Sequence, residues 1–232
     1  MGTRTKDITQ RDQKPLTIVH PEVDTYQHKL LSRHDEPVLA EMEEFASARN
    51  FPIVGRIVGS FLEVMALSIR ARTVFEFGSG FGYSAYWFSR AVGPQGTVIC
   101  TDGDGGNTEQ ARQFLAKTGR IDRVQFHTGW AQEIFKTTTE LFDVIYNDVD
   151  KDAYPEVWTL SKDRIRPGGL YIADNVLWGG RVALPEPGDE VFPGWTEAIK
   201  EHNYLISIDP EFDSFINPSR DGVIVARRRL DL

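Results

Sequence analysis

The chain has 232 residues, of which 41% are hydrophobic and 11% aromatic, and a formal net charge of −8. This much apolar material supplies a core for one large domain and excludes a disordered or fibrous protein. The acidic balance opposes any binding mode that relies on broad phosphate neutralisation, so nucleic acid is not an expected main partner. No stretch reaches the roughly 18 uncharged apolar residues of a membrane span, so we expect no membrane segment.

The start of the chain differs from the rest in composition. Residues 1–20 are polar, show no periodicity and lack the apolar stretch of a secretory signal, which predicts an N-terminal arm before a single domain over residues 21–232. The single cysteine, Cys100, lies in the apolar run Val98–Cys100 and is expected to be a buried, unreactive thiol. A chain that cannot form an internal disulfide fits a reducing compartment, and we expect a cytoplasmic protein.

Two helices are predicted before the first strand. Asp35 before Pro37 is a helix-start signal, and the apolar residues that follow recur at helical spacing. A second helix is predicted from about Gly55 to Ile69, where the apolar residues again fall on one face.

From Thr73 onward, short apolar runs alternate with helical segments. The predicted strands are Thr73–Phe77, Thr97–Thr101, Val124–His127, Phe142–Tyr146, Leu170–Ala173, Leu205–Ile208 and Gly222–Ala226. Strands separated by helices are typical of βαβ units, so we predict an α/β fold with a largely parallel sheet. The Gly- and Pro-rich stretch from Trp178 to Pro193 is predicted to be a loop that forms a wall of the active site.

A glycine-rich turn, Gly78 to Ser84, follows the first predicted strand and precedes a helix. Its glycines let the backbone approach a ligand and present N–H groups at a helix N-terminus. Tyr83 stands where the dinucleotide fingerprint has its third glycine, which argues against NAD. Asp102 ends the next strand, where a carboxylate can accept both hydrogen bonds of a ribose diol. Turn and acid together predict a nucleoside cofactor site; the alternative is a tight turn with Asp102 as a helix cap.

A second polar group follows two later strands. Asp148 and Lys151 come after Phe142–Tyr146, and Asp174 and Asn175 come after Leu170–Ala173. If these strands are neighbours, three oxygen ligands meet at one edge of the sheet, which suits Mg²⁺, Mn²⁺ or Ca²⁺ better than Zn²⁺. Such an ion activates a substrate hydroxyl, and Lys151 would accept its proton or stabilise the oxyanion. The alternative is an ordinary helix cap at Asp148 and a solvated Lys151.

Three segments carry a resemblance to a known family. They are VFEFGSGFGYS (74–84), DVDKDAY (148–154) and PGGLYIADNVLW (167–178), and an Asp-Gly pair follows at 221–222. Over about residues 50 to 229 the chain resembles the metal-dependent class of S-adenosylmethionine (SAM) O-methyltransferases that includes catechol and caffeoyl-CoA O-methyltransferases. The resemblance implies a Rossmann-like methyltransferase fold, in which a seven-stranded, mostly parallel sheet has an antiparallel last strand and helices on both faces. It also implies a homodimer.

The resemblance further implies roles for individual residues. The cofactor-binding positions correspond to Val54, Glu76, Gly78, Ser79, Ser84, Asp102, Trp130, Ala131, Gln132, Asp148 and Asp150. Within this set the glycine turn faces the methionine part, with Glu76 beneath it, while Asp102 faces the ribose and Trp130 the adenine. The metal ligands correspond to Asp148, Asp174 and Asn175, and the catalytic residues to Lys151, as the proposed base, and Asp148.

The acceptor side departs from the family pattern. Catechol-specific members have an acidic residue six positions before the Asp-Gly pair, where this chain has Phe215, and this argues against a strict catechol preference. Gly80 and Phe81 replace an aromatic-then-small pair in the turn, and Asn147 is polar where most relatives are apolar. The candidates for an aromatic acceptor pocket are Trp178, Arg181, Trp195, Phe215 and Arg220.

The sequence therefore predicts an enzyme that transfers a methyl group from SAM to a hydroxyl of a small aromatic acceptor, catechol-like or phenylpropanoid-like, with a divalent cation. Three alternatives stay open. The first is a tRNA hydroxyuridine O-methyltransferase of the same class, for which Arg227, Arg228 and Arg229 would supply a local basic patch. The second is a non-catalytic nucleoside-binding module, and the third is an NAD dehydrogenase.

Overall fold

The strands of the described chain form one mixed sheet. In this computed structural model, which describes residues 18–31, 36–183, 192 and 194–230, the strand order is β3-β2-β1-β4-β5-β7-β6. The strands are β1 (Thr73–Phe77), β2 (Thr97–Asp102), β3 (Val124–Thr128), β4 (Phe142–Asn147), β5 (Ile165–Ala173), β6 (Phe212–Asn217) and β7 (Val223–Arg228). Strands β1 to β5 pair in parallel, whereas β7 is antiparallel to both β5 and β6. The predicted mostly parallel sheet with an antiparallel last strand is confirmed.

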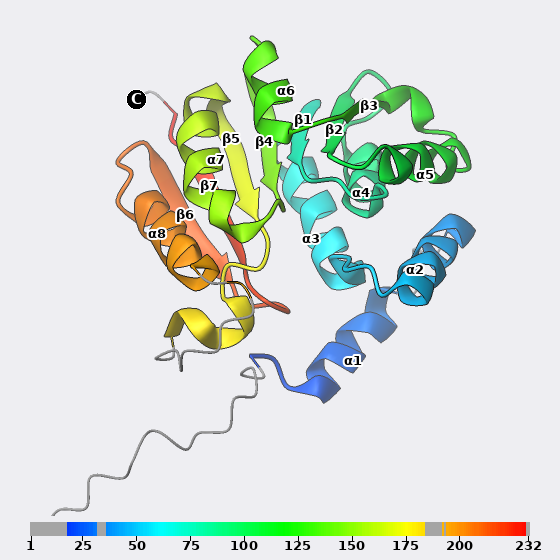
Figure 1. Cartoon of the computed structure of the whole chain (residues 1–232), viewed down its shortest axis with the longest axis horizontal. Coiled ribbons are helices and arrows are strands. Elements are labelled where there is room, and N and C mark those ends of the chain that lie inside the picture. The colour runs from blue at the N-terminus through cyan, green and yellow to red at the C-terminus, as the bar shows by residue number, and fades with distance from the viewer. Residues whose placement is uncertain (1–17, 32–35, 184–191, 193, 231–232) are drawn as a thin grey trace, which may run out of the picture.

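Helices cover both faces of this sheet (Figure 1). On one face lie α2 (Pro37–Arg49), α3 (Gly55–Ser68), α4 (Tyr83–Ala91) and α5 (Gly105–Ala116), and on the other α6 (Ala131–Thr137), α7 (Tyr154–Ser161) and α8 (Trp195–Ser207). Alternation along β1 separates the two cores: Val74 packs with the first set of helices, and Phe75 and Phe77 pack with the second. Because both faces are covered, the central strands read as nearly continuous apolar runs.

The predicted early helices are present. Helix α2 begins at Pro37, with Glu36 as the extended residue before it, and α3 ends one residue before the predicted Ile69. Asp35 and residues 1–17 of the predicted arm lie outside the described residues. The described chain begins just before helix α1 (Pro21–Leu31), which contacts α3 and has none of its own residues buried.

One predicted strand is wrong. Leu205–Ile208 lies at the end of α8, and the strand comes later, at β6. Ile199, His202 and Ile206 are buried on one face of α8, so the apolar run belongs to a helical pattern rather than to a strand. In β6 Phe212 is buried and the residues after it are exposed or half-buried, so this edge strand carries little apolar signal in the sequence.

The strand order reverses between β1 and β4. The main-chain N–H of Asp148, just after β4, donates to the oxygen of Phe77 at the end of β1, at 2.9 Å. In open α/β sheets, ligands bind beyond the carboxyl ends of the strands at such a switch point. Gly78 and Asp148, the first residues after these two strands, therefore face one crevice.

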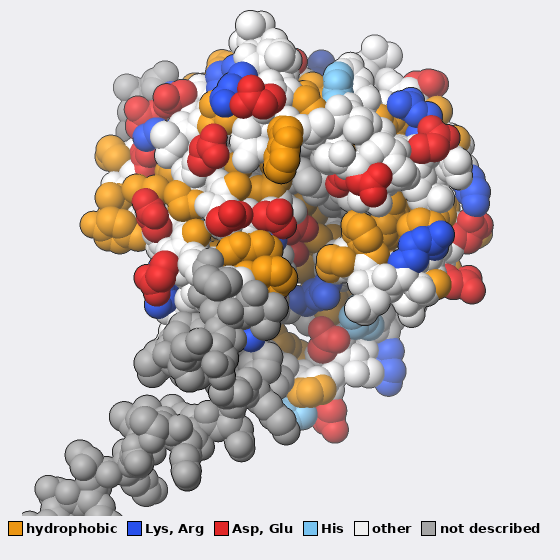
Figure 2. All heavy atoms as spheres, viewed as in Figure 1, with side chains coloured by type: hydrophobic (Ala, Val, Ile, Leu, Met, Phe, Trp, Pro, Cys, Tyr) orange, Lys and Arg blue, Asp and Glu red, His pale blue; other side chains and the backbone are white. Residues whose placement is uncertain are grey.

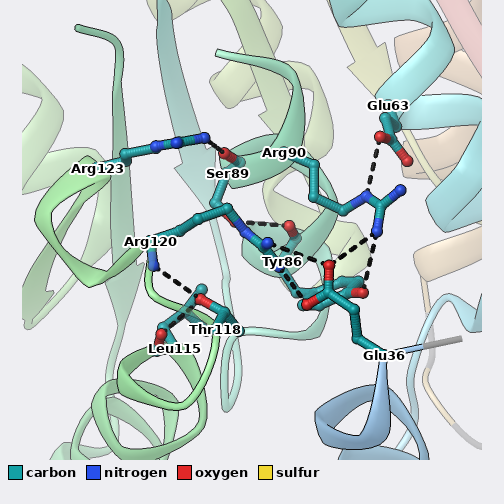
Figure 3. Close-up of polar contacts among 9 residues, drawn as sticks. All are labelled: Glu36, Glu63, Tyr86, Ser89, Arg90, Leu115, Thr118, Arg120 and Arg123. Carbon is teal, nitrogen blue, oxygen red and sulfur yellow. Dashed lines mark hydrogen bonds and ion pairs between the residues drawn. The ribbon is translucent and has the colours of Figure 1, made fainter. Parts of the chain in front are cut away.

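A network of ion pairs fixes the start of α2 (Figure 3). Glu36 accepts hydrogen bonds from Arg120 at 2.7 Å and from Arg90 of α4 at 3.1 Å, and Arg90 also donates to Glu63 of α3 at 2.9 Å. The network connects the start of α2 to α3, to α4 and to the turn after α5. Since α2 forms one side of the cavity described below, this network also positions that side.

Two smaller expectations can be compared with the fold. Cys100 is buried, as predicted. Within the residues that the structure describes, no helix has the length and apolar character needed to cross a membrane.

Candidate active site

A cavity of about 1510 Å³ lies at the carboxyl ends of β1, β2 and β4. Figure 2 shows the molecule hollowed between the body of the sheet and the helices α1 and α2. The predicted site residues that line the cavity are Val54, Gly78, Ser79, Ser84, Asp102, Trp130, Ala131, Gln132, Asp148, Asp150, Lys151, Asp174 and Asn175. The predicted ligand set and the predicted cofactor positions other than Glu76, which does not line the cavity, therefore share one cavity.

The glycine turn brings the main chain of β1 close to the end of β4. Gly78 has a φ of +81°, and a Cβ there would lie 2.7 Å from the oxygen of Asp148, so both the conformation and the space require glycine. The turn is also held from β2, because Ser79 N–H donates to Thr101 O at 2.8 Å and Thr101 N–H donates to Ser79 Oγ at 3.0 Å. The loop is thus fixed before any ligand enters.

Glu76 lies on β1 beneath this turn and is completely buried. The Cys100 thiol donates to its Oε2 at 3.2 Å, while its Oε1 has no hydrogen-bond partner among the described residues. Burial raises the pKa of Glu76 to about 7, although the hydrogen bond from Cys100 acts in the opposite direction. A buried carboxyl with an open acceptor atom fits a ligand that brings an ammonium or another donor.

Asp102 presents a fixed carboxylate at the end of β2. It accepts hydrogen bonds from the main chain of Gly80 at 3.0 Å and of Asp104 at 2.8 Å, and from the Asn107 amide at 3.1 Å. The helix-cap role considered for Asp102 belongs instead to Asp104, whose side chain accepts from Gly106 N–H at the start of α5. Asp102 is therefore oriented toward the cavity without capping the helix.

Trp130 stands on the rim of the cavity. It immediately precedes α6, and 78% of its surface is exposed. A large exposed aromatic ring beside a cavity is suited to stacking on a planar ligand ring. The structure is therefore compatible with the adenine side that the resemblance implies for Trp130.

Lys151 joins the two loops that carry the predicted metal ligands. Its ammonium donates to Asp148 Oδ1 at 2.8 Å, to Val149 O at 3.1 Å and to the Tyr154 hydroxyl at 2.9 Å. Tyr154 in turn donates to the main-chain oxygen of Asp174 at 2.9 Å. Sequence reasoning did not single out Tyr154. The available signal was its place three residues after Lys151, at the start of a helix.

Asp174 and Asn175 follow β5, which is next to β4 as predicted. Asp174 is buried, and its Oδ1 has no hydrogen-bond partner among the described residues. Burial, and then the charge of Asp148, raise the pKa of Asp174 to about 7. In the described part of the chain no three His, Cys, Asp or Glu side chains cluster as a metal site. The predicted ligand set has two carboxylates and an amide, and so contains only two such side chains.

A buried chain of hydrogen bonds connects the end of β4 to the loop that carries Asp174 and Asn175. Asn147 donates to the Tyr171 hydroxyl at 3.0 Å, and that hydroxyl lies 2.9 Å from His202 Nε2. His202 Nδ1 lies 3.1 Å from Asn203 Oδ1, and the Asn203 amide donates to Val176 O at 2.8 Å. Burial lowers the pKa of His202 to about 4, so the ring is neutral near pH 7. The polar Asn147 therefore begins a chain that ends beside Asn175.

Aromatic side chains form another wall of the cavity. The rings of Trp178 and Trp195 lie 5.6 Å apart, and Phe192 stacks on Trp195 at 4.2 Å. Trp178 begins the short helix η6 (Trp178–Ala183). Most of the predicted active-site loop, residues 184–191 and 193, lies outside the described residues.

The predicted acceptor-pocket residues divide into two groups. Trp178, Trp195 and Arg220 line the cavity. Arg181 and Phe215 are not among its lining residues, and Phe215 stands on the edge strand β6 with 68% of its surface exposed. The sequence position of Phe215 relative to the Asp-Gly pair therefore does not place its side chain in the pocket.

Comparison with known proteins agrees with this arrangement. A family model described as O-methyltransferase matches residues 29–229, which is most of the chain. The chain belongs to the O-methyltransferase family. The predicted resemblance is thus confirmed, and for this methyltransferase the NAD dehydrogenase alternative no longer stands.

Individual relatives of the methyltransferase match over most of its length. A catechol O-methyltransferase of Mycobacterium tuberculosis is 34% identical over 184 residues, which are 77% of this chain and 80% of the relative. Caffeoyl-CoA O-methyltransferase 1 of Eucalyptus globulus is 28% identical over 216 residues, 88% of this chain and 87% of the relative.

Solved structures extend the similarity to the whole fold. The O-methyltransferase TomG from Streptomyces achromogenes, solved in complex with SAM, has a TM-score of 0.79 at 26% identity and covers 90% of this chain and 96% of its own. An O-methyltransferase from Bacillus cereus, solved in complex with SAH, has a TM-score of 0.78 at 26% identity. The match covers 90% of this chain and 97% of the Bacillus cereus protein.

Proposed function

We propose that this methyltransferase transfers the methyl group of SAM to a hydroxyl of a small aromatic acceptor and uses a divalent cation to do so. The observation that carries the proposal is the meeting, in one cavity, of the glycine turn and Asp102 with the group of Asp148, Lys151 and Asp174. The names of the catechol and caffeoyl-CoA O-methyltransferase relatives support the acceptor class.

The cofactor half of the cavity suits a cationic nucleoside. SAM carries a sulfonium and an ammonium group, and the open Oε1 of Glu76 offers a buried acceptor beneath the turn. Asp102 would accept from the ribose diol, and Trp130 would stack on the adenine. The neighbours solved with SAM and with SAH support this placement.

Asp148, Asp174 and Asn175 fit a divalent cation. Asp174 Oδ1 is buried without a partner in the described chain, and Lys151 is the ammonium that offsets the charge of Asp148. Oxygen ligands of this kind suit Mg²⁺, and also Mn²⁺ or Ca²⁺. When bound, such a cation orients an acceptor hydroxyl and lowers its pKa.

The chain's own residues would then serve the transfer. Lys151 is held by its contacts with Asp148 and Tyr154. As a neutral amine it would take up the proton of the acceptor hydroxyl, and as an ammonium it would instead offset the charge that develops on the oxygen. As the bond between the methyl carbon and the acceptor oxygen forms, the carbon–sulfur bond of SAM breaks and SAH is released. The aromatic wall of Trp178 and Trp195 would orient the acceptor ring.

The test is transfer of labelled methyl from SAM to a panel of catechols, caffeate esters and flavonoids, with Mg²⁺ and with excess EDTA. We expect transfer that is lost with EDTA and restored by Mg²⁺. We also expect loss of transfer in Asp148→Asn and in an Asp174→Asn variant that still binds SAH. Transfer that survives EDTA would refute the role of the cation. An absence of transfer to every acceptor would refute the acceptor class.

The tRNA alternative receives no support from the basic segment at the C-terminal strand. Arg228 pairs with Glu211 at 3.0 Å, and Arg229 pairs with Asp213 at 2.7 Å, so neighbouring carboxylates offset this charge. The homodimer, the cytoplasmic location and the domain limits of 21–232 stay predictions.

A further inference from the structure

The cavity has a charge pattern that the transfer reaction does not account for. Among the lining residues that the structure describes, Lys151 and Arg220 are the cations, and they face a larger number of carboxylates. Some of those carboxylates form ion pairs with other residues. Lys151 contacts Asp148 at 2.8 Å, and Arg56 contacts Glu43 at 2.7 Å.

Arg220 is exposed and, unlike these groups, forms no ion pair with a described residue. Its Nη1 donates to the main-chain oxygen of Ile53 at 2.8 Å, and no carboxylate oxygen of the described residues lies within 4.0 Å of the guanidinium. A guanidinium has several N–H donors in a planar fork, so a single carbonyl leaves most of them available. Gly55 leaves room for the group, because a Cβ there would lie 2.8 Å from Nη1.

The position of Arg220 places this charge beside the acceptor wall. It stands in the turn between β6 and β7, with a φ of +51°, directly before Asp221. Asp221 accepts hydrogen bonds from the main chain of Leu177 and Gly179, which flank Trp178. The charge of Arg220 also acts on the carboxylates of Asp221 and Asp174, although it forms an ion pair with neither. An aromatic wall and a guanidinium without an ion pair among the described residues therefore flank the same space.

We propose that Arg220 binds an anionic group of the acceptor, so that this enzyme prefers an aromatic diol that carries a carboxylate over neutral or cationic catechols. The inference rests on the proposed function. A carboxylate complements the guanidinium fork with two parallel hydrogen bonds, while the ring of the same molecule packs on the indoles. A cationic or neutral acceptor would offer the guanidinium no carboxylate for this pair of hydrogen bonds.

The experiment compares 3,4-dihydroxybenzoate with its methyl ester, which has the same diol and no charge. We expect the acid to have the higher kcat/KM in the wild-type enzyme. Arg220→Gln should lower kcat/KM for the acid by about 10- to 100-fold more than for the ester, because one charge-assisted bidentate contact is lost. Arg220→Lys should recover part of the difference, since it keeps the charge without the fork.

A matched control separates this contact from a general change in charge. Arg181→Gln removes an arginine that contacts Trp178 but does not line the cavity, and it should leave the ratio of acid to ester unchanged. SAH affinity of each variant, measured by calorimetry, reports whether the cavity is intact. Equal losses for acid and ester in Arg220→Gln would mean that Arg220 only clamps Ile53, and the proposal would be wrong.

Two further arms decide the remaining cases. If neither compound is methylated, the wider acceptor panel decides the proposed function, and the carboxylate site is judged by binding alone. We then expect 3,4-dihydroxybenzoate to bind more weakly to Arg220→Gln than to the wild type. Unchanged binding would overturn it. If caffeoyl-CoA loses more in Arg220→Gln than free caffeate does, the anion is a CoA phosphate, and the preference for a carboxylate is refuted.

Discussion

The hydroxyl of Tyr154 donates to the main-chain oxygen of Asp174 at 2.9 Å and accepts a hydrogen bond from Lys151 at the same distance. Burial raises the pKa of this phenol well above its usual value, so it stays protonated and keeps its donor. One neutral hydroxyl therefore sets the distance between the candidate base and the loop of the candidate metal ligands.

Removal of this hydroxyl should disturb catalysis more than folding. In Tyr154→Phe the ring still fills its place in the core, and the lost hydrogen bonds should lower the free energy of unfolding by about 1–2 kcal/mol. We expect kcat to fall by about tenfold with little change in SAH affinity, since Lys151 and Asp174 lose their common support. Steady-state kinetics with a denaturation curve checks this, and an unchanged kcat would show that the contact is only structural.

Lys151 should act on turnover rather than on acceptor binding. Lys151→Met is expected to lower kcat by about 10²- to 10⁴-fold, while the acceptor KM changes less. This pattern is expected because the variant loses a group that acts in the transition state. Lys151→Arg keeps a charge that cannot be released as a proton, so it should be as inactive as Lys151→Met if Lys151 is the base. A higher KM at normal kcat would place Lys151 in binding instead.

Glu76 should make the stability of the ligand-free protein depend on pH. Its pKa is about 7 in the folded chain against an ordinary 4.5, so the folded state holds a proton that the unfolded state releases between these values. The stability that this group contributes is thus fully present below about pH 4.5 and is lost as the pH rises through about 7. At about pH 8, Glu76→Gln should therefore be more stable than wild type by about 3 kcal/mol.

Urea unfolding at about pH 5 and about pH 8 measures this difference. The exposed Glu133 of α6 provides the control. Glu133→Gln should change the free energy of unfolding by the same amount at both pH values. If the stability of Glu76→Gln relative to wild type does not change with pH, Glu76 is not titrating in the folded protein.

The ion pairs of Glu36 should stabilise α2 and, through it, the cavity. Glu36 accepts from both Arg90 and Arg120, whose side chains are largely buried, with 19% and 15% of their surface exposed. Glu36→Gln should cost about 1–2 kcal/mol of unfolding free energy and weaken SAH binding, and the cost should shrink at about 1 M salt. Glu41→Gln, which breaks the exposed pair with Lys117, should cost less than about 0.5 kcal/mol. Equal losses in the two variants would argue against a special role for Glu36.

Much of the site could be predicted from the sequence because its parts are local. Gly78 directly follows one apolar strand, and Asp102 is the last residue of the next. Asp148 and Asp174 each directly follow a later apolar strand. Parallel strands place such residues at one edge of the sheet, so their chemistry could be inferred before their contacts were known. The false strand at Leu205–Ile208 shows the limit of this approach, since a short apolar run has the same appearance in a helix and in a strand.

The sequence by itself determined the α/β class, the family, the glycine turn and the oxygen-rich group, because each depends on the order of residues along one segment. Only the tertiary structure decided which distant side chains meet. It joined Lys151 to Asp174 through Tyr154, placed Asp104 rather than Asp102 at the helix cap, excluded Phe215 from the cavity and left Arg220 facing it. These relations depend on helix packing and strand order across the switch point, and local spacing carries no record of either.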